Sequence, residues 1–158
     1  MILPRPARNA MLVVHVAGSV GFMGAIASFL ALAGVGITAG PFAARSAYVA
    51  MEAVTLWVIL PLGTLSLVSG LIEGLVTRWG LFRHYWVTAK LLVTAIALVV
   101  LAAKLGLIRR AASIAAVRPF NEAERFDIGL QLLVHAAGGL AVMVIALILS
   151  IYKPRGTR

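Results

Sequence analysis

Residues 11–36 read MLVVHVAGSVGFMGAIASFLALAGVG, a run of 26 residues without a charged side chain. A helix needs about 20 apolar residues to cross the ~30 Å hydrocarbon core of a bilayer, so this run is long enough to span it. Outward from it, three further apolar runs of similar length follow, at residues 47–76, 85–108 and 128–152. We therefore predict an all-α fold, an integral membrane four-helix transmembrane bundle that forms a single domain over residues 1–158.

The overall composition leads to the same class. The chain is 62% hydrophobic and 12% charged, whereas roughly 25% charged residues is usual for a soluble domain. A net charge of +9 would suggest nucleic-acid binding in a soluble chain. Here the basic residues meet anionic lipid headgroups first, so we expect contact with the lipid bilayer and no nucleic-acid binding. Because there is no cysteine, disulfides, thiolate-held iron–sulfur clusters and covalently attached haem are excluded.

The connections between the runs carry helix-ending signals. Gly40-Pro41 indicates a stop followed by a new start, and residues 77–84 form a tight, aromatic-rich turn between the second and third spans. Residues 109–127 read as a longer polar loop, in which Asn121 and Glu124 resemble a capping box for a helix that begins near residue 122. The basic start of the chain resembles a signal peptide, but its apolar stretch is too long, so we expect it to remain as the first span.

Basic residues beside the spans predict the orientation. With the amino terminus inside, seven Lys and Arg residues flank the spans on the cytoplasmic side and six on the other. The positive-inside rule therefore favours a multi-pass protein with both termini in the cytoplasm.

Two of the three histidines lie in a repeated phrase, VHVAG at residues 14–18 and VHAAG at residues 134–138. If the first and last helices are antiparallel, His15 and His135 differ in depth by more than ~10 Å, so they cannot ligate one haem iron. His84 is at nearly the depth of His15. We therefore predict His15 and His84 as cofactor ligands, with Gly18 leaving room for a b-type haem, or with Glu73 completing a metal site.

Other polar residues inside the spans have two readings. Glu73 and Lys90 lie at equal depth on either side of the 77–84 turn, and we predict that they form a buried ion pair or a proton relay. His135 is expected to contact Glu52 or Gln131 as a polar contact between helices. A stripe of small residues on the first span predicts a helix-packing seam, formed by Ala17, Gly21, Gly24 and Ser28.

Several segments resemble a known family. RSAYVAME, LPLGTLSLVSGLIEGLVTRWGLFRHYWVTAKLLVT and LLVHAAGGLAVMVIALILSIYKPRG resemble small bacterial four-span membrane proteins that form a domain of unknown function. That resemblance implies the fold and a location in the bacterial cytoplasmic (inner) membrane, but no activity.

A more distant resemblance connects the chain with haem proteins. VVHVAGSVGFMGA and TRWGLFRHYWVTAKLL are similar to helices of copper-resistance-D-type proteins and of membrane protoporphyrinogen oxidases. It implies a haem role for His15 and matches Lys90, whereas His84 and His135 have no counterpart.

Three classes of function follow from these residues. The first is a redox protein that binds haem b or a metal through His15 and His84. The second is a small proton- or ion-coupled transporter that uses Glu52, Glu73 and Lys90, with Pro61 as a break in the second span. The third is an accessory or scaffold subunit, in a homo-oligomer or a membrane complex. No hydrolase or phosphate-loop pattern is present, so the sequence assigns no enzymatic reaction.

Overall fold

The computed structural model describes residues 4–76, 81 and 84–152. In this part of the chain there are five α-helices and one π-helical segment. They are α1 (Arg5–Thr38), α2 (Pro41–Val54), η1 (Thr55–Ile59), α3 (Leu60–Val76), α4 (Tyr85–Val117) and α5 (Glu122–Tyr152). Because α2, η1 and α3 are continuous, they form one long rod, and the chain is an all-α four-helix bundle.

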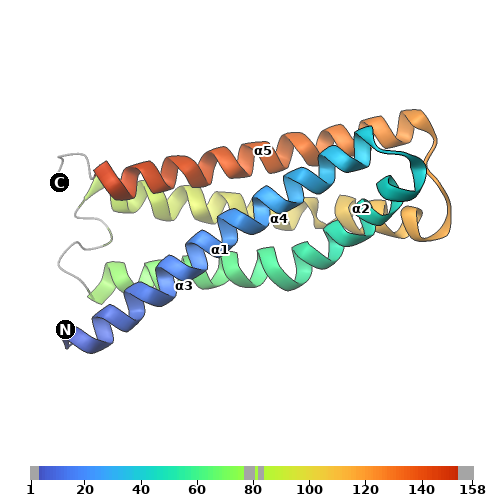
Figure 1. Cartoon of the computed structure of the whole chain (residues 1–158). Helices are drawn as coiled ribbons and strands as arrows, with labels where there is room; N and C mark the ends of the chain where they lie inside the picture. Colours follow the sequence, from blue (N-terminus) through green and yellow to red (C-terminus); the bar gives the residue numbers. More distant parts are fainter. Residues whose placement is uncertain (1–3, 77–80, 82–83, 153–158) are drawn as a thin grey trace.

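Each of the four rods is long and apolar enough to cross a membrane, as expected of a multi-pass membrane protein. The start of α1, the start of α4 and the end of α5 lie at one end of the bundle, which we call the terminal end (Figure 1). The α1–α2 and α4–α5 connections lie at the opposite end, the loop end. With 33 residues, α4 is about 50 Å long, so it exceeds the ~30 Å hydrocarbon core.

The predicted helix boundaries are confirmed at the loop end, with one exception. The helix restarts at Pro41, after Gly40, and the Asn121 Oδ1 atom accepts a hydrogen bond from the Glu124 amide at 2.8 Å, as in a capping box. The long loop predicted for residues 109–127 is wrong, because α4 continues to Val117. Its last turns are rich in alanine, a strong helix former, and Ala111 and Ala115 are almost fully buried.

Two arginines bind helix ends across the loop end. Arg45 of α2 donates a hydrogen bond to the carbonyl oxygen of Ala116 in α4, and Arg125 of α5 donates one to Ala39, the residue after α1, at 3.0 Å. The last carbonyls of a helix have no partner within the helix and carry partial negative charge. Each arginine therefore satisfies and neutralises the end of a helix to which it does not belong.

The π-helical segment η1 explains how Pro61 is accommodated. Proline has no amide hydrogen and crowds the carbonyl four residues earlier. In η1 the Leu60 amide bonds to Thr55, five residues back, and the rod continues through Pro61 without ending. The break predicted at Pro61 is therefore a wider turn, with Thr55 fully buried and its hydroxyl bonded to the Met51 carbonyl at 2.7 Å.

The core lies between large residues of α1 and the other helices, including Phe22, Phe29, Tyr48 and Met51. The packing seam predicted for Ala17, Gly21, Gly24 and Ser28 is wrong, because Ala17, Gly24 and Ser28 are exposed. The buried face of α1 instead includes Phe22 and Phe29, because large side chains fill the space between long helices. A close approach does occur elsewhere: a Cβ atom on Gly63 would lie 2.7 Å from Leu98 and 2.9 Å from Phe22.

Candidate functional site

A cavity of about 250 Å³ lies between α1, α3, α4 and α5 in the half of the bundle nearest the terminal end. We call it the polar cavity, because ionisable and hydroxyl side chains line it among apolar residues. The polar residues are His15 and Ser19 of α1, Ser66 and Glu73 of α3, Lys90 and Thr94 of α4, and Ser150 of α5. Four helices therefore contribute polar groups to one space inside an apolar bundle.

His15 is held in place by α3. Its Nδ1 atom lies 3.1 Å from the Ser66 carbonyl oxygen and 3.0 Å from the Ser69 Oγ atom. A carbonyl only accepts, so Nδ1 carries the hydrogen, and in neutral His15 the Nε2 atom is a hydrogen-bond acceptor. Gly70 makes room for the ring, since a Cβ atom there would be 2.9 Å from the His15 Cε1 atom.

Glu73 and Lys90 line this cavity together, but not as the direct pair that the sequence predicts. The Lys90 ammonium donates a hydrogen bond to the Ser150 Oγ atom at 2.9 Å and lies 4.8 Å from the centroid of the Trp86 ring. Over the described residues the structure has one ion pair, Arg118–Glu124 at 2.8 Å, so a salt bridge between Glu73 and Lys90 is not formed. The hydroxyl that Lys90 contacts instead belongs to α5, outside the hairpin of α3 and α4.

His84 is not brought to His15. It is the residue before α4, its carbonyl accepts the amide of Val87 at 3.1 Å, and its ring lies 6.1 Å from that of Trp86. It does not line the polar cavity. The aromatic turn that precedes it, residues 77–80 and 82–83, falls outside the described residues.

The space predicted beside Gly18 is also filled. A Cβ atom at Gly18 would already be in contact with Leu65, at 3.4 Å. No group of three metal-ligating side chains occurs among the described residues. The described residues thus do not bring His15 and His84 together in this cavity, and they do not place His15, His84 and Glu73 around one metal.

The polar contacts predicted around His135 form within α5. The His135 Nδ1 atom donates to the Gln131 carbonyl at 2.6 Å, and the Gln131 side chain donates to Asp127 at 3.2 Å. Neither histidine nor glutamine reaches Glu52 by a hydrogen bond. The expected contact between helices is thus a contact along one helix, because residues four apart already lie on the same face.

Sequence reasoning missed the hydroxyl partners of the site. Ser66 and Ser69 are 4% and 2% exposed, and Ser150 holds Lys90. The Ser19 and Ser66 hydroxyls lie 2.7 Å apart and tie α1 to α3. The signal available for α3 was the spacing of Ser66, Ser69 and Gly70, which places them on one helical face.

Outside the apolar part of the bundle, the described residues form one ion pair, at the loop end. Arg118 and Glu124 form a two-point contact at 2.8 Å, and the bonded carboxylate raises the pKa of the Arg118 guanidinium. This pair bridges the connection between α4 and α5, at the end of the bundle opposite the polar cavity.

The fold and the site together define a class: a multi-pass helical membrane bundle with a polar cavity between its helices. Comparisons with protein-family models, with curated proteins and with solved structures found no match for this chain.

Proposed function

We propose that the chain is a small proton-coupled carrier of the bacterial cytoplasmic membrane, with the polar cavity as its solute site. One observation carries the proposal: an imidazole, a carboxylate and an ammonium group from three different helices line one cavity, without a salt bridge between Glu73 and Lys90. Ionisable residues are costly within a membrane and usually mark a path for ions, protons or substrate.

The size and charges of the cavity favour a small zwitterion. Its 250 Å³ corresponds to about eight water molecules at ~30 Å³ each. Lys90 suits a carboxylate, whereas Glu73 suits an ammonium group. An amino acid or a similarly small zwitterion has both groups, so one molecule in the cavity could contact both side chains.

Proton coupling would occur at Glu73 and His15. Protonation of Glu73 removes the negative charge that holds the ammonium group of the solute, so uptake of a proton weakens solute binding. His15 presents Nε2 as an acceptor while Nδ1 is fixed by Ser66. A proton on Nε2 adds a positive charge to the same wall, which favours the carboxylate of the solute.

The proposed orientation places both termini in the cytoplasm, so the polar cavity lies in the cytoplasmic half. Solute would then enter from that side or leave to it. The wider turn at η1 lies along the same rod as Ser66, Ser69 and Glu73 and is the irregular part of that rod. Such π-helical turns are frequent at functional sites in helices.

A flux assay tests the proposal. Proteoliposomes loaded with a pH-sensitive dye receive a defined mixture of amino acids outside, and the pH of the lumen is followed. Because solute and proton compete at Glu73, inward movement of solute should carry protons outward, so we expect the mixture to raise the luminal pH with the unmodified protein and not with Glu73→Gln. The matched control is Glu122→Gln, which removes an exposed carboxylate at the loop end and should behave as the unmodified protein. Equal rates in protein-containing and empty vesicles would reject the carrier.

Haem b with a single axial histidine is the second candidate. The observation that favours it is that the Nδ1 hydrogen of His15 is bonded to a backbone carbonyl, which leaves Nε2 for a metal, as is usual for metal-ligating histidines. Protein purified after haem-supplemented expression would then show a Soret band that His15→Ala removes and His135→Ala retains. If neither flux nor a Soret band is found, the third class, an accessory subunit of a membrane complex or homo-oligomer, is the function to test.

A further inference from the structure

A second cavity of about 380 Å³ lies between α1, η1, α4 and α5, and we call it the lateral groove. Its walls are apolar except for Lys104 of α4 and His135 of α5. Ile96, Val100 and Val134 line it and are between 43% and 56% exposed, so the groove opens sideways, where the hydrocarbon of the bilayer lies.

Glycines on α5 keep the groove open. A Cβ atom added to Gly138 would meet nothing within 4 Å, and one on Gly139 would meet Ile26 at 3.9 Å. Both glycines line the groove, opposite α4. The space between α4 and α5 is therefore wide enough for another apolar chain to pack there.

The charge in the groove comes from Lys104. This residue is half-buried, and its ammonium has no hydrogen bond or ion pair with any residue that the structure describes. Lys104 lies five residues before Arg109. At the rise of an α-helix, Lys104 is therefore about 7.5 Å closer to the middle of the bundle than Arg109 is. A cation at that depth costs free energy unless it pairs or reaches the interface.

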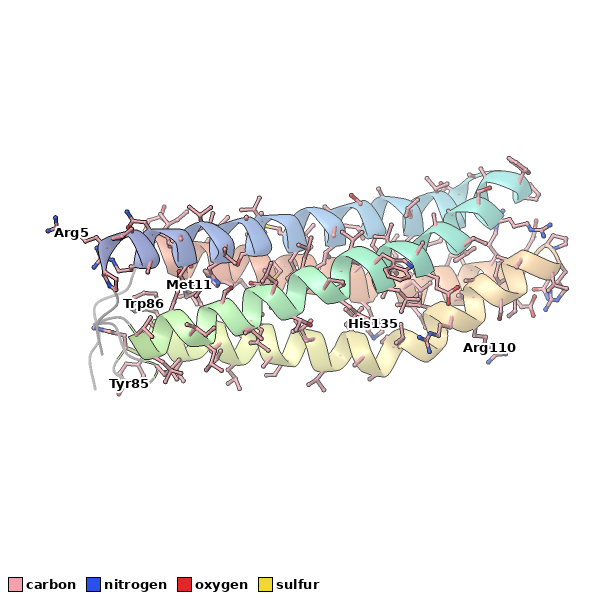
Figure 2. The ribbon with its side chains drawn as sticks, turned by 90° about the horizontal axis from the view of Figure 1, so that it is seen from below. Arg5, Met11, Tyr85, Trp86, Arg110 and His135 are labelled. Carbon is pink, nitrogen blue, oxygen red and sulfur yellow. The ribbon has the colours of Figure 1, made fainter. Side chains whose placement is uncertain are left out.

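His135 adds a polar group. Its Nδ1 atom donates to the Gln131 carbonyl, and in the neutral ring the Nε2 atom is then an acceptor. Figure 2 shows His135 part-way along the bundle and Arg110 nearer the loop end. The groove thus combines an apolar channel with one cation that needs an anion.

We propose that the lateral groove binds an anionic phospholipid of the bilayer, with an acyl chain between α4 and α5 and the phosphate paired with Lys104. The bilayer supplies both parts of this ligand at the place where the groove opens. Apolar packing alone would accept the acyl chain of any lipid. The Lys104 ammonium adds a preference for anionic lipids, because a zwitterionic headgroup has its own positive charge beside the phosphate and an anionic headgroup does not. This inference concerns a different cavity from the proposed carrier site and does not depend on it.

The preference of the groove for anionic lipid can be measured by the lipids that the protein retains on extraction. The protein is reconstituted in an equimolar mixture of phosphatidylglycerol and phosphatidylcholine, extracted gently, and the bound lipids are counted by native mass spectrometry. We expect preferential retention of phosphatidylglycerol. Lys104→Gln should lower this preference about fivefold, as expected for the loss of one basic residue near a lipid headgroup, and Lys104→Arg should keep it. Arg110→Gln removes an exposed cation of the same helix outside the groove and should keep it as well.

A second pair of variants tests the acyl-chain site. Gly138→Leu adds bulk to the groove, at a position where the Cβ atom meets nothing within 4 Å, and should reduce retention of both lipids. Gly24→Leu adds the same bulk at an equally open position outside the groove and should not. The proposal is overturned if Lys104→Gln prefers phosphatidylglycerol as strongly as the unmodified protein does. It is also overturned if Arg110→Gln lowers this preference as much as Lys104→Gln does. Equal losses with Gly138→Leu and Gly24→Leu would also overturn it.

Discussion

Replacing Gly70 by alanine should disable the polar cavity while leaving the fold almost equally stable. The added Cβ atom would lie 2.9 Å from Cε1 and 3.4 Å from Nδ1 of His15, closer than the ring and the methyl group can remain. The helix backbone is fixed by its own hydrogen bonds, but the imidazole is the end of a side chain. The ring therefore rotates away, and Nδ1 loses its contacts with Ser66 and Ser69.

The free-energy terms nearly cancel. Losing a typical hydrogen bond costs about 1 kcal/mol. Replacing glycine by alanine inside a helix gains about 1 kcal/mol. The net change in the free energy of unfolding should therefore lie within about 1 kcal/mol of zero, although the His15 geometry is lost.

Gly34→Ala is the matched control. Gly34 lies within α1, and a Cβ atom added there would meet nothing within 4 Å, so alanine should stabilise the helix by about 1 kcal/mol without disturbing His15. Thermal unfolding in detergent, followed by circular dichroism, measures the stability of both variants. Nitrogen-15 NMR of the imidazole measures the site, with the His15 signals identified by their absence in His15→Gln.

In the unmodified protein, neutral His15 should carry its hydrogen on Nδ1. Gly70→Ala should change this to a mixture of the two neutral forms, and it should abolish the solute-dependent flux if the cavity is the carrier site. The reasoning is refuted if the unmodified protein carries the hydrogen on Nε2, or if Gly70→Ala retains the Nδ1 form. A loss of stability well above 1 kcal/mol would show that the ring cannot move.

Two further predictions concern the loop end. Tyr48→Phe removes a buried hydroxyl that donates to the Arg125 carbonyl at 3.1 Å, and thermal unfolding should show a loss of about 1 kcal/mol; Tyr152→Phe, at a position 79% exposed, should show none. Asn121→Ala should cost about 1 kcal/mol through loss of the α5 cap, while Asn121→Asp should retain the stability, and equal Tm values for the two variants would contradict the capping role.

The fold was predictable because the decisive signal is local. Apolar runs of more than 20 residues identify the four rods, and Gly40-Pro41 and Asn121 with Glu124 mark two helix starts by their own chemistry. The extension of α4 to Val117 was not recognised, since the charges of Arg109 and Arg110 suggested a loop. Those side chains are exposed, whereas the alanines that follow them pack into the core.

The site was predictable only in part, because it depends on which faces of different helices meet. Equal depth placed Glu73 and Lys90 at the same level, and both do line one cavity. Depth along the membrane carries no information about rotation around each helix. The contacts of Lys90 with Ser150 and of His15 with Ser66 were therefore missed. His84 precedes α4 and is not among the residues that line the cavity with His15, so the pairing of these two histidines around a cofactor stays a prediction.

Arg45 and Arg125, which bind the ends of other helices at the loop end, affect the order in which the bundle can be completed during synthesis. Membrane helices are inserted in the order of synthesis, so α1 and α2 are in the bilayer while α4 and α5 are still being translated. The carbonyl of Ala39 cannot accept its hydrogen bond before Arg125 has been synthesised, and Arg45 cannot donate its hydrogen bond before Ala116 has been synthesised. Neither half of the chain contains its own partners, so in a nascent chain that ends before residue 125 the carbonyl of Ala39 has not yet received its hydrogen bond. Synthesis of the last helix is thus the event that completes the end of the first one.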